Sequence, residues 1–484
     1  MPEAISGLTP PLVWKYFGEI SAIPRCSKNE AAIARYLVDT ARSLGLETDQ
    51  DANGNVVVRK AASPGRDGVP MVCLQGHMDM VCEKNKDKVH DFQSDPLELV
   101  RQGNFLMANG TTLGADNGIA VATSLAIMAD RSLEHGPLEF LFTVDEETGL
   151  TGANTLEPGF LKSRILLNLD SEEEGALYVG CSGGRDTSGT WQAEYEAVPA
   201  GASPMLVKIT GLKGGHSGLE IHQGRGNSLK VLTRVLLCLA RVGGRVARIE
   251  GGNKRNAIPR EAEAVVLLPA GKEAEAEACV SRMQEAAAAE FATVDPGVTI
   301  GLERISEAPT DVLAAALQQR VLLALAALPH GVLKMSPDIP GLVETSTNLA
   351  IIKTERDNIT VQTSQRSSVA SEIEEAAQMV RAVFELSGAS VTGSDGYPGW
   401  KPNLGSPILG VAKSTYMSLY GREPEVKAVH AGLECGIIGE KYPGMDMVSF
   451  GPTLEGVHSP DEKIHIDTVP MFWEFLLSIL KNVK

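Results

Sequence analysis

This sequence of 484 residues lacks regularly spaced cysteines, long apolar runs and an excess of positive charge. Its seven cysteines are odd in number, far apart and without the paired spacing of a zinc finger, so we expect a reducing compartment and no disulfide framework. The most apolar run, at 321–328, is much shorter than the ~20 residues of a membrane-spanning helix. It therefore predicts a buried helix.

The charge balance is acidic, with a formal net charge of -17. This balance disfavours nucleic acid as a partner, because proteins that bind phosphates normally present a basic face. The first residues lack the basic start and apolar core of a secretory signal, so we predict a cytoplasmic location and no membrane partner. The chain is 43% hydrophobic and 22% charged, as in ordinary globular proteins, and its length predicts two to four folding units.

Apolar strands and helices alternate in the first part of the chain. Strands are expected at 55–58, 71–74, 138–144 and 165–169, and a helix at 116–129. Such alternation is typical of an α/β protein built in layers around a sheet.

Five short motifs hold imidazoles and carboxylates at or just after predicted strand ends, where open α/β sheets place their ligands. They are Gly-His-Met-Asp at 76–79, Gly-Ala-Asp-Asn-Gly at 114–118, Asp-Glu-Glu-Thr-Gly at 145–149, Leu-Asp-Ser at 169–171 and His-Ser-Pro at 458–460. A metal pair that activates water needs such a set: histidine nitrogens, a carboxylate that bridges the ions, and a further acid that moves the proton.

The domain organisation depends on the last of these motifs. The pattern of strands and helices changes near residue 187, and a second unit then extends to a turn-rich stretch near residue 398. If His458 is to join His77, the last segment must return to the first domain. We therefore expect a discontinuous catalytic domain, residues 1–186 plus 399–484, with residues 187–398 inserted as a second domain.

Two of the motifs also fit plainer roles. His77 and Asp79 are two residues apart at a strand end, so Asp79 could orient the imidazole, or the pair could form an ordinary polar turn. Asp116 lies at a predicted helix start, where a carboxylate is often a simple N-cap. The glycines on either side of it would let the backbone pack closely around a carboxylate that bridges two cations.

The acids at 145–147 follow an apolar strand and repel one another. They are either a solvated loop or the neighbours of a bound cation, with one glutamate as ligand and the other as general base. Asp170 closes another strand and could ligate from there. His458 lies in a turn-rich loop, where a single histidine is usually only a surface residue, and it gains meaning from the other four motifs.

The order of the motifs resembles the di-zinc metallopeptidase family that includes carboxypeptidase G, acetylornithine deacetylase and peptidase T. The resemblance covers nearly the whole chain, and the motifs at 76–84, 111–119 and 213–218 are most similar to bacterial dipeptidases of this family. It implies a catalytic domain of three α/β/α layers with a mixed sheet, and an inserted α+β domain that serves as lid and dimerisation domain. It also implies two divalent metal ions per subunit, with zinc expected and cobalt or manganese as alternatives.

The resemblance assigns a role to each candidate residue of the catalytic domain. The implied metal ligands are His77 and Asp170 for one ion, Glu147 and His458 for the other, and Asp116 as the bridge. Glu146 would be the general base that takes a proton from a metal-activated water, and Asp79 would orient His77. The family also implies a cis peptide bond between Asp116 and Asn117.

The resemblance places three further residues in the inserted domain. His216 matches a histidine that stabilises the oxyanion, often across a dimer interface, and Asn256 matches a substrate-binding asparagine. Arg366 falls where relatives carry an arginine for the substrate carboxylate, with Arg255 or Arg260 as alternatives, because a guanidinium can pair with a carboxylate at two points.

The expected function is metal-dependent hydrolysis of dipeptides with broad specificity, including Xaa-His dipeptides, by a homodimer. One alternative is an N-acyl amino acid amidohydrolase or aminotripeptidase of the same fold. An alternative of another class is a non-catalytic, metal-dependent peptide-binding protein.

Overall fold

The computed structural model describes residues 2–484, and contacts within the chain divide them into two compact units. Unit 1 comprises the residues up to Cys181 together with Trp400–Ala428 and Leu433–Lys484, and unit 2 comprises Ser182–Gly399 and Val429–Gly432. From the sequence we assigned 1–186 and all of 399–484 to the catalytic domain, whereas residues 182–186 and 399 belong to unit 2. The structure also places 429–432 in unit 2, because the Ser182 amide donates to the main-chain oxygens of Val429 (3.1 Å) and Ala431 (3.0 Å).

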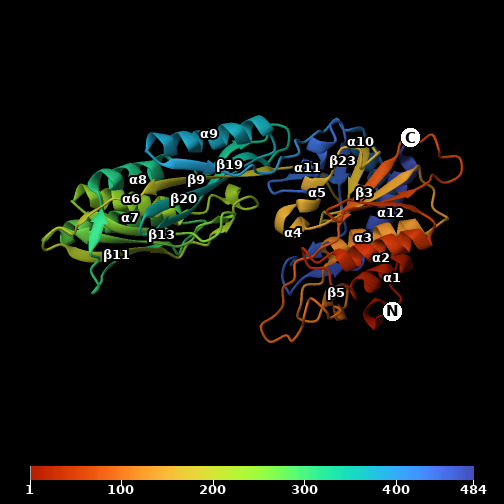
Figure 1. The fold of residues 1–484 in the computed structure, drawn as a ribbon, viewed down its shortest axis with the longest axis horizontal. Helices are drawn as coiled ribbons and strands as arrows, with labels where there is room; N and C mark the ends of the chain where they lie inside the picture. Colours follow the sequence, from red (N-terminus) through yellow and green to blue (C-terminus); the bar gives the residue numbers. More distant parts are fainter. Residues whose placement is uncertain (1) are drawn as a thin grey trace. The chain divides into compact units, whose positions relative to one another are not determined.

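The main sheet of unit 1 is mixed and has eight strands (Figure 1). In sheet order they are β1 (Glu47–Gln50), β2 (Val56–Lys60), β6 (Leu138–Thr143), β3 (Val72–His77), β7 (Ile165–Asn168), β23 (Asp446–Ser449), β8 (Ala176–Cys181) and β22 (Glu425–Val429). Strands β6, β3, β7 and β23 run parallel to one another. Every residue of β3 and β6 is buried, as expected for parallel strands covered on both faces.

Helices accompany this sheet. The helices of unit 1 are α1 (Pro11–Ile20), α2 (Ala31–Ser43), α3 (Ala115–Ala129), α4 (Glu146–Gly149), α5 (Thr151–Thr155), α10 (Pro407–Tyr420), α11 (Glu434–Lys441) and α12 (Thr468–Asn482), with a 3-10 turn at Glu3–Ile5. Figure 1 shows α1, α2 and α3 together on one side of the sheet. Almost every residue of α3 is buried, which explains its run of alanine, valine, isoleucine and leucine.

A small second sheet of unit 1 holds the loop that carries His458. Its order is β24 (Leu454–Glu455), β25 (Lys463–His465), β5 (Phe105–Ala108) and β4 (Leu99–Gln102). β24 and β25 form a hairpin around the loop, and β25 pairs with β5. The C-terminal segment therefore does return to the N-terminal part of the chain.

Unit 2 is built on a nine-stranded antiparallel sheet. Its strands are β16 (Thr299–Arg304), β11 (Ser203–Thr210), β15 (Ala262–Leu268), β13 (Arg245–Gly251), β19 (Val343–Thr354), β20 (Asn358–Ser367), β9 (Gly183–Gln192) and β21 (Ser390–Gly393), with β18 (Gly331–Met335) beside β19. Two short pairs accompany it: β10 (Tyr195–Ala197) with β17 (Asp311–Leu313), and β12 (Gly215–His216) with β14 (Ala257–Ile258). Burial alternates along β11, as expected for a strand with one face on a core.

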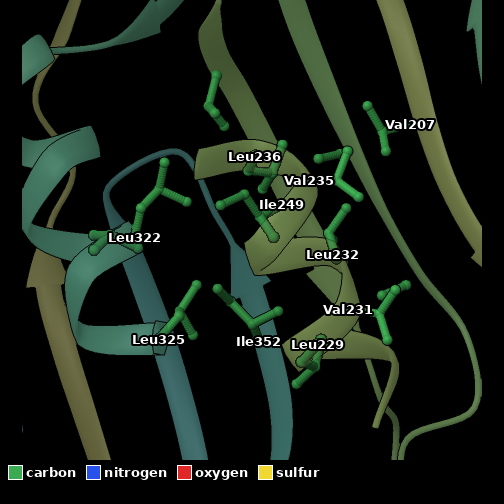
Figure 2. Packing of buried hydrophobic residues seen from close by; sticks show 14 of the residues in the cluster. Val207, Leu229, Val231, Leu232, Val235, Leu236, Ile249, Leu322, Leu325 and Ile352 are labelled. Carbon is green, nitrogen blue, oxygen red and sulfur yellow. The ribbon is translucent and has the colours of Figure 1, made fainter. Parts of the chain in front are cut away.

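Four helices bury their apolar sides on this sheet: α6 (Ser228–Arg241), α7 (Glu273–Glu290), α8 (Ala315–Ala327) and α9 (Ala370–Leu386). Figure 2 shows α6 at the centre of the core, with Leu232 and Leu236 among strand residues such as Ile249 and Ile352. The predicted combination of a mixed α/β domain and an inserted α+β domain is confirmed.

The cysteines depart from the expectation. The structure pairs Cys26 with Cys82 and Cys238 with Cys279 as disulfides, and leaves Cys73, Cys181 and Cys435 as free, buried thiols. Sequence spacing could not reveal the pairs, since their members are 56 and 41 residues apart. Folding brings them together. Cys26 forms an isolated β-bridge with Met80, two residues before Cys82, and the disulfide between Cys238 and Cys279 joins α6 to α7.

No helix among residues 2–484 is both long and apolar enough to cross a membrane. The apolar run at 321–328 lies in and just after α8, with most of its residues in the unit 2 core, as predicted.

Leu236→Ala should destabilise unit 2 by about 2–5 kcal/mol, because the 1% exposed side chain would leave a cavity in the core. Denaturation followed by circular dichroism would measure the shift of the unfolding transition. Leu323→Ala is the matched control, since Leu323 is 53% exposed and its loss should change stability by no more than about 0.5 kcal/mol. Equal shifts in the two variants would contradict the assignment of this core.

Candidate active site

Parallel strands bring the ligand-bearing segments to one edge of the main sheet. β3 ends at His77, with β6 and β7 in parallel register on either side. Glu146 and Glu147 open α4 just after β6, and Asp170 follows β7 closely. Because the carboxyl ends of parallel strands share one edge, these side chains meet there.

The first cluster consists of His77 and two carboxylates. His77 Nε2 lies 3.1 Å from Asp116 Oδ1 and 3.3 Å from Asp170 Oδ1. The three side chains are almost fully buried. Their ligand atoms lie within 4.8 Å of one another and could hold a metal ion.

The second cluster shares Asp116 with the first. His458 Nε2 lies 3.2 Å from Asp116 Oδ2 and 2.9 Å from Glu147 Oε2. The two oxygens of Asp116 thus face different histidines, one in each cluster. The structure brings together all five residues for which the sequence predicted metal binding, and that role stays a prediction.

The histidines and carboxylates of the two clusters shift one another's pKa values. Burial alone would raise the pKa of Asp116, but hydrogen bonds from His458 and His77 outweigh it and hold that pKa below its usual range. Hydrogen bonds to Asp116 and Glu147 raise the pKa of His458 to about 11. Burial raises the pKa of Asp170 to about 6. Metal ions and these protons would compete for the same atoms, because a histidine must be neutral to bind a metal.

Two carboxylate oxygens of the site are buried without a hydrogen-bond partner: Glu147 Oε1 and Asp170 Oδ1. His77 Nε2 carries at most one hydrogen and hydrogen-bonds to Asp116, so it leaves Asp170 Oδ1 unsatisfied. A buried acceptor without a partner costs free energy that a bound cation would recover. The donor set, two imidazoles with three carboxylates, fits zinc and similar divalent ions.

Asp79 supports the site from behind His77. Its Oδ1 lies 3.4 Å and its main-chain oxygen 3.1 Å from His77 Nδ1. The carboxylate also accepts from Ser27 Oγ (2.8 Å) and from the amides of Glu146 (3.1 Å) and Glu147 (3.3 Å). Burial opposes the charged form, yet His77, together with the Ser27 hydroxyl and the Glu146 amide, lowers the pKa of Asp79 to about 2. It is well placed to orient His77.

Glu146 lies beside the two clusters. Burial raises the pKa of its carboxyl group well above the usual value, as expected for a residue that exchanges protons. Glu146, Glu147 and His77 also have ligand atoms close enough to share a metal ion. The geometry therefore allows either glutamate to ligate, and only the family resemblance separates their roles.

Asp116 is not the simple N-cap that remained an alternative from the sequence. Its peptide bond to Asn117 is cis, as the resemblance implied, and both residues have non-helical backbone angles at the start of α3. Both of its carboxylate oxygens bond to histidines. The free amides of this turn bond instead to Glu462, a residue that the sequence analysis did not select although it is close to His458.

The position of Arg25 explains why the residues on either side of Asp116, at 114 and 118, are glycines. This buried guanidinium occupies the space where side chains at Gly114 and Gly118 would begin, since a Cβ at these positions would lie 2.5 Å and 2.6 Å from Arg25 Nη2. The glycines do permit close packing, as predicted, but of an arginine. Nothing in the sequence around Arg25 signals this role, because it comes from a segment about 90 residues away.

In unit 2, His216 and Asn256 line one open cavity of about 490 Å³. β12 and β14 hold the two segments together, and the Ser217 amide donates to the main-chain oxygen of Asn256 (2.9 Å). His216 Nδ1 accepts from the amides of Gly218 (3.2 Å) and Leu219 (3.0 Å), which leaves a hydrogen on Nε2. Burial, assisted by the charge of Arg366, lowers the pKa of His216 to about 4, so the ring is neutral near pH 7.

Arg366, on β20, is 7% exposed and donates to Tyr397 OH (3.1 Å), while its Nε has no partner. Ser346 stands opposite Arg366 on β19, and its hydroxyl lies 2.7 Å from His430 Nε2. His430 is a buried histidine that the sequence analysis missed. It belongs to the 429–432 segment, whose assignment to unit 2 had no signal in the local sequence.

Comparison with known proteins identifies the family. The model of the peptidase family M20/M25/M40 matches residues 73–482. The cytosol non-specific dipeptidase of Escherichia coli (strain K12) is 40% identical over 480 residues, which cover 99% of each chain.

Solved structures agree with this result. The aminoacylhistidine dipeptidase of Vibrio alginolyticus is 44% identical, with a TM-score of 0.93 over 99% of this chain and 98% of that chain. The aminopeptidase PepT of Bacillus cereus ATCC 10987 shares the fold at 17% identity, with a TM-score of 0.58 over 98% of this chain and 99% of its own. The finer resemblance to bacterial dipeptidases is confirmed, and the chain belongs to the peptidase family M20/M25/M40.

Proposed function

We propose that this chain is a metal-dependent dipeptidase of broad specificity that also accepts Xaa-His dipeptides. Both full-length relatives are dipeptidases by name, and one of those names specifies aminoacylhistidine. The observation that carries the metal dependence is Asp116, with one carboxylate oxygen at His77 and the other at His458.

His77 and Asp170 would hold one ion, His458 and Glu147 the other, and Asp116 would contact both. The unpartnered buried oxygens of Glu147 and Asp170 support this assignment. Zinc is the proposed metal, and cobalt or manganese could use the same ligands. When bound, such ions lower the pKa of water and polarise the carbonyl of the scissile bond.

Glu146 would take the proton from the attacking water and pass it to the leaving amine. Burial raises the pKa of Glu146 well above its usual value, and a raised carboxyl pKa supports a role in proton transfer. Asp79 would keep His77 oriented through Nδ1.

Unit 2 would supply the groups that bind the substrate. Arg366 is proposed for the carboxylate because the residue is buried and its Nε has no hydrogen-bond partner among residues 2–484. Arg255 is a weaker candidate, since it is exposed and already paired with Asp186. Asn256 would bind the peptide, and the neutral His216 would donate from Nε2–H to the oxyanion.

We further propose a cytoplasmic homodimer that dimerises through unit 2. The name of the Escherichia coli relative supports the location. The family resemblance at His216 supports the dimer.

A substrate panel tests the function. We expect the purified protein to hydrolyse a dipeptide faster than a tripeptide or an N-acetyl amino acid, and to lose this activity with chelator and regain it with zinc. The reason is that the proposed water activation requires the ions. Preference for either other substrate would favour the aminotripeptidase or amidohydrolase alternative. Metal binding without any hydrolysis would favour the non-catalytic one.

Glu146→Gln should lower kcat by about 10²- to 10⁴-fold while leaving the metal content unchanged, because the amide cannot accept the proton. Steady-state kinetics and metal analysis of the same sample would measure both. Glu173→Gln is the matched control, because Glu173 forms a salt bridge with Lys427 and has no assigned role. Undiminished hydrolysis by Glu146→Gln would refute the general-base role, and loss of metal would reassign the residue as a ligand.

Arg366→Met should raise KM for a dipeptide about 10- to 100-fold, because a charge-assisted hydrogen bond is worth about 1.5–3 kcal/mol. Hydrolysis of the corresponding dipeptide amide, which lacks the carboxylate, should change little. Arg255→Met serves as the comparison. If that variant instead loses selectivity for the free acid, the carboxylate role belongs to Arg255.

A further inference from the structure

The carboxylate of Glu462 is buried against the turn that carries Asp116. Its Oε2 accepts from the amides of Leu113 (2.7 Å) and Gly114 (2.9 Å), and its Oε1 accepts from those of Ala115 (2.8 Å) and Asp116 (3.3 Å). The residue is 2% exposed. Four consecutive amides therefore converge on one side chain.

These contacts resolve a competition at the start of α3. The first amides of a helix have no partner within the helix, and an aspartate at such a position readily bonds to them. Asp116 would then turn its carboxylate toward its own backbone. Glu462 takes the amide of Asp116 itself together with the three amides before it, and both oxygens of Asp116 are directed at His77 and His458.

Arg25 holds the other side of the same turn. Its Nη2 donates to the main-chain oxygen of Gly114, and its Nη1 donates to those of Met78 (3.2 Å) and Asp79 (3.1 Å). The turn is thus fixed between a buried carboxylate and a buried guanidinium. Arg25 also joins it to the segment that follows His77.

Glu462 is linked to the second histidine through its own loop. Glu462 and His458 both lie between β24 and β25, in the hairpin that pairs with β5. When Glu462 binds the amides, the loop that carries His458 is fixed beside the turn that carries Asp116.

We propose that Glu462 is a positioning residue that binds the main chain of 113–116 and so keeps the Asp116 carboxylate free for the metal centre. The inference rests on the proposed function, because it assumes that Asp116 contacts both ions. Glu462 acts through Asp116 and His458 and does not touch the substrate.

Glu462→Gln tests this role directly. The glutamine NH₂ group replaces an acceptor oxygen and faces amide donors, so the turn loses part of its anchor. We expect the affinity of the metal-free protein for zinc to fall about 10- to 100-fold, the usual effect of losing a residue that orients a ligand. The visible absorption of the cobalt-loaded protein should change, and kcat should fall with little change in KM.

Asp461→Asn is the matched control, because it makes the same change of charge at the adjacent, exposed residue. Isothermal titration with zinc, cobalt spectra and melting of the metal-free protein should be measured on both variants. Glu462→Asp provides a second variant if Glu462→Gln does not fold. It keeps the charge but is one methylene shorter, so it should lose less affinity.

The outcomes separate the two proposals. If the folded Glu462 variants bind zinc and absorb as Asp461→Asn does, the positioning role is wrong, even if their metal-free melting temperature falls. If the wild-type protein itself fails to bind two ions, the proposed metal centre is wrong. Neither readout requires dipeptide hydrolysis.

Discussion

Buried negative charge is the constraint on which unit 1 depends. The carboxylates of Asp116, Glu147 and Asp170, none more than 12% exposed, converge on the buried His77 and the half-exposed His458, and Glu146 lies next to them. Isolated carboxylates in such a place would bind protons or destabilise the fold. The two histidines offset them when protonated, which explains why the pKa of His458 rises so far. Two divalent ions would offset the charge more completely and release the imidazoles as neutral ligands.

This constraint also explains the discontinuous architecture. The three parallel strands β6, β3 and β7 deliver acids and one imidazole to the sheet edge, but Asp116 has a second oxygen to satisfy. The partner comes from the far end of the chain, on a hairpin held against β5. Sequence reasoning reached this part of the fold because a single chemical requirement, that His458 join His77, fixes where the last segment must go. The apolar strands predicted that the motifs lie at strand ends, and the glycines beside Asp116 predicted close packing around its carboxylate.

The contacts that could not be predicted join residues far apart in the chain, where the sequence around one residue does not indicate its partner. Arg25 occupies the space that Gly114 and Gly118 leave, but glycines do not specify what fills such a space. The disulfide partners are distant in sequence and meet only when loops and helices pack. His430 reaches unit 2 on a four-residue segment that returns briefly from unit 1, so the local pattern of strands and helices could not assign it. Local sequence patterns do not determine such long-range contacts, whereas they do predict the strands that carry the motifs.

The amide contacts are similar at two of the ligand-bearing turns, that of Asp116 and that of Glu146 and Glu147. Both turns begin a helix, where free amides would attract the carboxylate of the same turn. In each case a different acid takes the amides: Glu462 bonds to those of 113–116, and Asp79 to those of Glu146 and Glu147. Asp79 therefore does more than contact His77, because it also leaves both glutamate side chains free of their own backbone. At both helix starts a second carboxylate thus satisfies backbone amides beside a proposed ligand, which accounts for two of the buried acids of unit 1, Glu462 and Asp79.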